Sequence, residues 1–148
     1  MDKKNIIFYS AALAVVFLDQ LIKFLVRQNI QLGQSIPIIK NVFHLTYVAN
    51  TGSAFGLFKS FSIIFFVLFS IIVIIGIFYY LKKIIKEDKK LELAVGLLLG
   101  GTIGNLIDRL AFGTVIDFLD FRIWPVFNIA DSAVSVSIIL LIFILWKK

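Results

Sequence analysis

The chain contains no cysteine and only one histidine, His44. Without cysteine it cannot form disulfides, thiolate nucleophiles or thiolate metal sites. A single histidine makes a histidine-based metal site or a Ser-His-Asp triad very hard to build. The H-E-x-x-H zinc motif and the G-x-S-x-G nucleophile turn are also missing. A hydrolase of this composition would therefore use carboxylates or a serine–lysine pair, and we expect neither a metal nor a cofactor.

Charged residues are scarce as well, at 16% of the chain, whereas 60% of the residues are hydrophobic and 16 of the 148 are phenylalanine. Soluble domains have roughly 45–50% apolar and about 25% charged residues. Because so short a chain cannot bury this much apolar surface in a core of its own, lipid is the expected solvent. The length fits a single integral membrane domain, residues 1–148. In such a chain the net charge of +6 is explained by the positive-inside rule, by which lysine and arginine collect on the cytoplasmic side of a membrane protein. No nucleic-acid partner is expected.

Four apolar runs approach the length of about 20 residues that crosses a bilayer. They cover residues 6–26, 61–81, 91–110 and 129–146. We therefore predict an all-α membrane protein with four transmembrane helices. The first run follows two lysines, as a secretory signal would, but it continues into Asp19-Gln20 without a small-residue cleavage site. We interpret it as a permanent anchor.

Lysine and arginine predict the orientation of these helices. One side would carry nine of them in short segments: Lys3, Lys4, Lys82, Lys83, Lys86, Lys89, Lys90, Lys147 and Lys148. The other side would carry six over longer connections: Lys23, Arg27, Lys40, Lys59, Arg109 and Arg122. The positive-inside rule then places both termini in the cytoplasm and residues 27–60 and 111–128 outside.

Five aspartates are predicted to reach one depth near the outer face. Asp19 would lie roughly 20 Å above the start of the first run and Asp108 about 25 Å above the start of the third. Asp131 falls in the first outer turn of the fourth run, and Asp117 and Asp120 lie in the connection before it. Ionisable groups at membrane depth are costly and usually mark function or a pairing partner. Their convergence therefore predicts a site.

Taken singly, these acids have simpler explanations. Asp131 would be the third residue of a helix capped by Asn128, as in a capping box. Asp19 and Lys23 are four residues apart and could form a plain helical salt bridge. Asp117 could be a solvated loop residue.

The third run shows how helices could approach closely around such a site. Glycines recur every fourth residue, at Gly96, Gly100 and Gly104, and form a ridge on which another helix can pack tightly. Asn105 and Asp108 share a helix face. Arg109 lies nearby and could pair with one of the aspartates.

Two aspartates brought within a few ångströms cannot both ionise and therefore share a proton. The ionised one takes a proton from water while the protonated one polarises a scissile carbonyl. Asp117 and Asp131 are 14 residues apart, with Pro125 between them, and this spacing permits such a pair. On spacing alone, Asp108 or Asp120 could substitute.

Five sequence blocks in order resemble the lipoprotein signal peptidases (signal peptidase II) of bacteria over almost the whole chain. They are Asp19-Gln20 with Lys23, the segment 50–55 (NTGSAF), the segment 100–109 (GGTIGNLIDR), the segment 115–118 (VIDF) and the segment 127–132 (FNIADS). Each block alone is a weak pattern. Together, on a chain of this length with four apolar runs, they form a specific signature.

The resemblance implies an aspartyl endopeptidase of the bacterial inner membrane, active near the outer face. It would remove signal peptides from prolipoproteins immediately before a cysteine that carries diacylglycerol, with membrane lipid as its other partner and as a monomer. The catalytic pair would be Asp117 and Asp131. The positions that shape or support the site would be Asp19, Lys23, Asn50, Gly52, Asn105, Asp108, Arg109, Asn128 and Ala130.

The resemblance also implies a small extracytoplasmic β-cradle and a helix-bearing loop over the site, within residues 27–60. The sequence itself shows only a weak alternation over residues 42–48 that ends at an Asn-Thr-Gly turn. An apolar rim would suit acyl chains, although each member could equally belong to an interfacial aromatic belt. The rim consists of Phe55, Phe58, Phe118, Phe121, Trp124 and Phe127.

Three alternatives remain open. Ser53, where the family often has alanine, could act with Lys59 in a serine–lysine mechanism, although both lie outside the acid cluster. A small transporter could use Asp19, Asp108 and Asp131 as a proton relay, but the chain has no inverted repeat and its acids avoid the midplane. A purely structural subunit would leave the acids without a reason.

Overall fold

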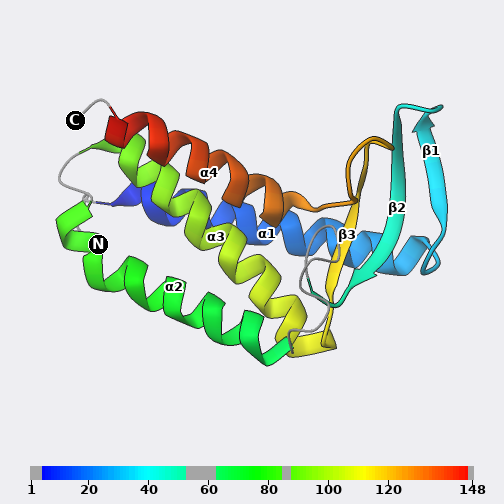
Figure 1. Ribbon diagram of the computed structural model, residues 1–148, viewed down its shortest axis with the longest axis horizontal. Helices are drawn as coiled ribbons and strands as arrows, with labels where there is room; N and C mark the ends of the chain where they lie inside the picture. The colour runs from blue at the N-terminus through cyan, green and yellow to red at the C-terminus, as the bar shows by residue number, and fades with distance from the viewer. Residues whose placement is uncertain (1–4, 53–62, 85–87, 147–148) are drawn as a thin grey trace.

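The computed structural model describes residues 5–52, 63–84 and 88–146, which form four helices and a small sheet (Figure 1). In chain order the elements are α1 Ile6–Asn29, β1 Ser35–Ile39, β2 Phe43–Asn50, α2 Ile63–Ile84, α3 Lys89–Phe112, β3 Val115–Asp120 and α4 Ile129–Trp146. The helices α1 and α3 run towards the sheet, and α2 and α4 run away from it (Figure 1).

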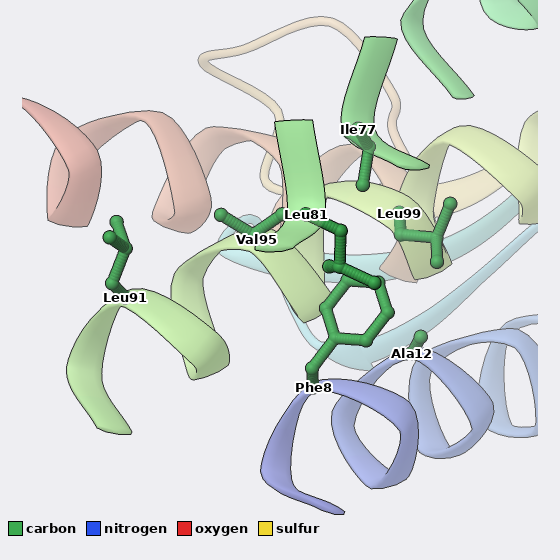
Figure 2. Packing of buried hydrophobic residues seen from close by; sticks show 7 residues of the cluster. All are labelled: Phe8, Ala12, Ile77, Leu81, Leu91, Val95 and Leu99. Atoms are coloured by element: carbon green, nitrogen blue, oxygen red, sulfur yellow. The ribbon is translucent and has the colours of Figure 1, made fainter. Parts of the chain in front are cut away.

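Helix α3 is the centre of the bundle and packs against α1, α2 and α4. Away from the sheet, side chains of α1, α2 and α3 converge in one apolar cluster (Figure 2). Its buried members are Phe8, Ala12, Ile77, Leu81, Leu91, Val95 and Leu99. The Phe8 ring is completely buried and meets the Phe78 ring edge to face at 6.4 Å. Apolar packing therefore holds these three helices together at this end of the bundle.

Glycines of α3 allow its close contacts with two helices. A Cβ at Gly96 would lie 2.5 Å from the Phe8 carbonyl oxygen of α1, and one at Gly100 would lie 2.7 Å from that of Ala12. The ridge predicted from the sequence therefore packs against α1. Gly101, on another face of α3, meets the Ala130 backbone of α4 so closely that a Cβ would overlap its carbonyl oxygen.

The outer surface of the bundle is apolar, as expected for contact with lipid. Large hydrophobic side chains are exposed along α1, α2 and α4, with Leu13, Ile72 and Phe143 as examples. Helices α1, α3 and α4 are long and apolar enough to cross a membrane, and α2 contains a shorter apolar stretch, Ile63–Tyr79. The chain is an integral membrane protein. The count of four spans stays a prediction.

The three strands form an antiparallel sheet in the order β1-β2-β3 beside the ends of α1 and α3 (Figure 1). Strands β1 and β2 are a hairpin, whose turn contains Asn41 in the left-handed conformation. Strand β3 follows α3 after Gly113, which ends that helix with φ 72°. In β2, Leu45 pairs with Leu119 and Val48 with Asp117, so β2 has an extra residue opposite Phe118.

The sheet corrects two expectations. The helices carry a small sheet, as the resemblance implied, so the chain as a whole is not all-α, and the sheet is not confined to residues 27–60, because the connection after the third run supplies β3. The weak alternation over residues 42–48 does mark a strand, Phe43–Asn50. Residues 53–60 lie outside the described residues, so the helix-bearing loop, Phe55, Phe58, Ser53 and Lys59 keep their status as predictions.

Candidate active site

Four aspartates from four elements gather where the bundle meets the sheet. Asp19 comes from α1, Asp108 from α3, Asp117 from β3 and Asp131 from the first turn of α4. Asp19, Asp108 and Asp117 are at most 1% exposed, and Asp131 is half-buried. Asp117 is therefore a buried strand residue, and its interpretation as a solvated loop residue is wrong.

The fifth acid, Asp120, takes no part in this cluster. Its carboxylate accepts a hydrogen bond from Thr46 Oγ1 at 2.6 Å and pairs with the Arg122 guanidinium at 2.9 Å. Because the Asp120 carboxylate is bound by Thr46 and Arg122 and by none of the other four aspartates, we do not regard it as a member of the catalytic pair.

The start of α4 is a capping box that places Asp131. The Asp131 amide N–H donates to Asn128 Oδ1 at 2.8 Å, and the Asn128 amide N–H points back to Asp131 Oδ2 at 3.4 Å. Asp131 is thus part of a capping box, as the sequence predicts, but it also makes a second contact. Its other oxygen, Oδ1, accepts a hydrogen bond from Asn105 Nδ2 at 2.7 Å.

Asp117 is held from two sides on β3. Asn50, near it on the neighbouring strand, donates from Nδ2 to Asp117 Oδ2 at 2.9 Å. The Gly52 amide N–H in turn donates to Asn50 Oδ1 at 3.0 Å. On the other side, Asn128 Nδ2 donates to Asp117 Oδ1 at 2.7 Å.

Asn128 and Asn105 connect the two carboxylates. Besides its bond to Asp117, Asn128 Nδ2 lies 3.1 Å from Asn105 Oδ1, and Asn105 Nδ2 donates to Asp131. Asn128 is completely buried and Asn105 nearly so. Two aspartates thus belong to one hydrogen-bonded group whose connecting members are neutral amides.

The environment of Asp117 favours its protonated form. Burial, and after it the charge of Asp131, raise the pKa of Asp117 to about 7, against the opposing effect of hydrogen bonds from Asn50 and Asn128. A carboxyl group with this pKa holds a proton near neutral pH and can donate it.

A buried lysine lies between the two other aspartates. Lys23 Nζ is 2.7 Å from Asp19 Oδ2 and 2.9 Å from Asp108 Oδ2. The predicted helical salt bridge of Asp19 and Lys23 is therefore present, and a second acid joins it. Lys23 also donates to Asn105 Oδ1 at 3.0 Å, which links this cluster to the pair.

Arg109 lies at the edge of the site without an ion pair to any described residue. Its guanidinium lies 5.2 Å from the centre of the Phe66 ring and donates a long hydrogen bond of 3.4 Å to the Asn105 carbonyl oxygen. Its charge nevertheless acts on Asp131, Asp117 and Asp108. The suggestion that Arg109 pairs with an aspartate does not hold, because Lys23 has that role.

The aromatic rim is only partly as predicted. Phe118 is buried in the cluster between sheet and α1, not at a rim. Phe121 and Trp124 are exposed, and Phe121 stacks on Phe127 with ring centres 5.9 Å apart. Of the four described members, Phe121 and Trp124 therefore form the exposed part of the predicted rim.

Gln20 is a member of the site that sequence reasoning did not single out, although it stands in the Asp19-Gln20 block. Its Nε2 donates to Asp108 Oδ1 and to the Gly104 carbonyl oxygen, each at 3.0 Å. The remaining supporting residue, Ala130, donates its amide N–H to Asp19 Oδ1 at 2.9 Å. Among the described residues no group of three His, Cys, Asp or Glu side chains could hold a metal ion.

The sequence is similar to those of a known family of peptidases. A family model described as Signal peptidase (SPase) II matches residues 11–147. The lipoprotein signal peptidase of Halothermothrix orenii is 47% identical over 140 residues, which cover 95% of both chains. That of Moorella thermoacetica is 47% identical over 134 residues, 90% of this chain and 89% of the relative. That of Bacillus subtilis is 46% identical over 139 residues, 91% of this chain and 90% of the relative.

Two solved structures have the same fold. Both are described as a bacterial membrane enzyme structure obtained by the in meso method, and they match with TM-scores of 0.89 and 0.88. Their sequences are 34% and 32% identical to this one, and each match covers 95% of this chain, with 87% and 93% of the solved chains. The chain therefore belongs to the signal peptidase II family of peptidases.

Proposed function

We propose that this protein is an intramembrane aspartyl endopeptidase whose catalytic pair is Asp117 and Asp131. Its substrates are prolipoproteins that carry a diacylglyceryl cysteine, and it cuts the signal peptide immediately before that residue. The observation that carries the proposal is the group of asparagine-linked carboxylates, in which Asn128 and Asn105 connect Asp117 to Asp131.

The two aspartates have different roles in this mechanism. Asp117, with its pKa raised to about 7, keeps the shared proton and donates a hydrogen bond to the scissile carbonyl oxygen. Asp131, at a helix N-terminus that favours its ionised form, takes a proton from the attacking water. That proton then passes to the leaving amine as the carbon–nitrogen bond breaks.

The position of the site suits a lipid-modified substrate. The signal peptide would lie among the helices while the acyl chains stay in the surrounding lipid, next to the exposed Phe121 and Trp124. Water would reach the scissile bond at the sheet end of the bundle.

The wider setting follows from the same proposal. Residues 1–148 act as one integral membrane domain with four spans, as a monomer in the bacterial cytoplasmic membrane. Both termini face the cytoplasm, and the sheet and active site lie at the outer face. The support is the balance of lysine and arginine between the two sides and the location of all three strands at one end of the bundle.

The proposal is tested with purified full-length Asp117→Asn and Asp131→Asn variants and a peptide that has a diacylglyceryl cysteine after the scissile bond. Each substitution keeps the shape of the side chain but removes either the acid or the base, so we expect kcat to fall more than about 100-fold. Insertion into the membrane should not change. Near-normal turnover by either variant would rule out the pair.

Asp120→Asn is the matched control, because it changes a buried aspartate on the same strand whose partners are Thr46 and Arg122. It should retain wild-type turnover. A loss as large as that of Asp117→Asn would make Asp120 a candidate member of the catalytic pair again. The transport alternative is separated in the same assay, since a transporter would cleave nothing. The unmodified peptide should also remain intact.

A further inference from the structure

The ion cluster of Asp19, Lys23 and Asp108 lies beside the proposed pair without belonging to it. All three side chains are at most 1% exposed, and the single ammonium bonds both carboxylates. Buried ion groups are weak evidence for stability, because well-packed apolar residues often serve equally well. The positions of the remaining hydrogen bonds indicate another purpose.

Each carboxylate of the cluster also binds one backbone amide. Asp19 Oδ1 accepts the Ala130 N–H at 2.9 Å, and Asp108 Oδ2 accepts the Ile116 N–H at 3.0 Å. Ala130 immediately precedes Asp131, and Ile116 immediately precedes Asp117. The two amides thus belong to the neighbours of the two proposed catalytic residues, on two different elements.

The same ammonium orients a side chain that touches the pair. Lys23 has only donors, so its bond to Asn105 Oδ1 requires the carbonyl end of that amide to face it. The NH₂ end then faces Asp131, to which it donates at 2.7 Å. Lys23 therefore has three connections that lead to the pair, two through backbone and one through a side chain.

Two further contacts help to hold the segments around Asp117 and Asp131 in place. A Cβ at Gly104 would lie 2.7 Å from Asp19 Oδ2, so the carboxylate occupies the space that this glycine leaves. On the far side of the pair, backbone bonds between Leu119 and Phe127 join the same two segments. Those bonds tie the chain after Asp117 to the chain before Asp131. The ion cluster supplies the tie on the other side.

We propose that Lys23 is a positioning residue that, through Asp19 and Asp108, sets the separation and orientation of the Asp117 and Asp131 carboxylates. This role rests on the proposed function, because it concerns the geometry of that catalytic pair. Lys23 itself is only 1% exposed, so we expect it to act on the pair without touching the substrate.

Lys23→Met in the full-length protein is the direct test, with kcat, KM and the pH dependence of cleavage as readouts. A misplacement of about 1 Å can cost up to about 100-fold in rate, so we expect kcat to fall roughly 10- to 100-fold. KM should stay within about twofold, because no substrate contact is lost. The high-pH limb should move to higher pH, because the charge of Lys23 lowers the pKa of Asp117 and methionine removes that charge.

Asp108→Asn is a second variant that alters the cluster without changing its volume. Asp108 accepts hydrogen bonds with both oxygens, from Gln20 at one and from Lys23 and Ile116 at the other. An asparagine has one oxygen and can serve only one of these sides, so we expect the same fall in kcat at an unchanged KM, here with the Lys23 charge retained. Arg27→Gln is the control, because this cation lies one turn after Lys23 and contacts the Phe112 ring instead.

The possible outcomes separate the two proposals. If wild type cleaves and Asp117→Asn does not, but folded Lys23→Met and Asp108→Asn keep the wild-type kcat, the positioning role is wrong. A change in KM alone would overturn it too, as would loss of folded protein in both variants, which would assign the cluster to folding. If wild type and Asp117→Asn behave alike, the proposed function itself has failed.

Discussion

At the scale of single residues, the site depends on which way its asparagine amides face. An amide has a donor at one end and an acceptor at the other, so its direction decides what it offers to a carboxylate. Asn50 and Asn128 present NH₂ to Asp117, and Asn105 presents NH₂ to Asp131. An aspartate in any of these three positions would bring a further acceptor to the pair where a donor is required.

The direction of each amide is enforced at its other end. Each carbonyl oxygen accepts from a group that can only donate, so a rotated amide would lose that bond and oppose donor to donor. These donors are the Gly52 amide N–H, the Asp131 amide N–H and the Lys23 ammonium. The surroundings of the pair are therefore preorganised to stabilise a negative charge on it.

The raised pKa of Asp117 predicts the pH dependence of cleavage. Below about pH 7 Asp117 holds the proton that polarises the scissile carbonyl, and above that pH the proton is lost. We expect kcat to decline as the pH rises through about 7. The measurement is the rate of lipopeptide cleavage from pH 5 to pH 9, at saturating substrate.

Asp120→Asn is the control for this profile as well, because the substitution removes a charge from β3 without touching Asp117 or its asparagines. Its high-pH limb should coincide with that of wild type. A wild-type rate that still rises between pH 7 and pH 9 would contradict the assignment of Asp117 as the acid.

At the scale of elements, α3 is the helix whose surface is shaped for close approach on two sides. Gly96, Gly100 and Gly104 face α1, and Gly101 faces α4. The contact of Gly101 falls on Ala130, whose amide is bound by Asp19 and which immediately precedes Asp131. Packing of α3 against α4 therefore bears directly on the position of one proposed catalytic residue.

Gly101→Ala should destabilise the protein and reduce its activity. The new Cβ would overlap the Ala130 carbonyl oxygen and lie 2.8 Å from Val134 Cγ2, so α4 must shift. Overpacking of this kind costs about 1–3 kcal/mol, and the shift should also lower kcat. Thermal unfolding in detergent and lipopeptide cleavage measure the two effects.

Gly76→Ala is the matched control, since nothing lies within 4 Å of a Cβ at that position of α2. Alanine is favoured over glycine in a helix by about 1 kcal/mol, so the midpoint of unfolding should stay the same or rise. Equal effects at both positions would mean that helix propensity, and not the contact with α4, governs Gly101.

The elements differ in how far the sequence predicts them. Apolar runs predict the helices well, because burial in lipid imposes a long and simple pattern; the fourth predicted run and α4 share their bounds. Strand β3 was missed. Its sequence VIDFLD is buried almost throughout and pairs with a strand some 70 residues earlier, across a bulge, so neither alternation nor a local turn marks it.

The same limit applies to the site. Helix rise places Asp19 and Asp108 at one depth, and the spacing of Asn128 and Asp131 predicts the capping box. The burial of Asp117 and the hydrogen bonds that separate Asp120 from the other acids depend on β3, so residue spacing could not choose the pair. The family resemblance supplied that choice. Gln20 was overlooked because its partners lie on another helix.

At the scale of the whole molecule, the site and the sheet share one end of an elongated bundle, and the start of α1 and the end of α4 share the other (Figure 1). The proposed reaction requires the site end to face outward, where exported prolipoproteins and water are found. The balance of lysine and arginine predicts this orientation, and the fold allows a test because Lys40 and Lys90 mark opposite ends.

The absence of cysteine makes that test direct, since a single introduced thiol is the only one in the chain. Lys40 is exposed in the turn between β1 and β2, and Lys90 is exposed in the first turn of α3. With an impermeant thiol reagent on intact cells, Lys40→Cys should be labelled and Lys90→Cys only after permeabilisation. The unmodified chain is the control for background. Labelling of Lys90→Cys alone from outside would show that the topology is the reverse of the predicted one. Asp117 and Asp131 would then lie on the cytoplasmic side, where they could not meet an exported prolipoprotein.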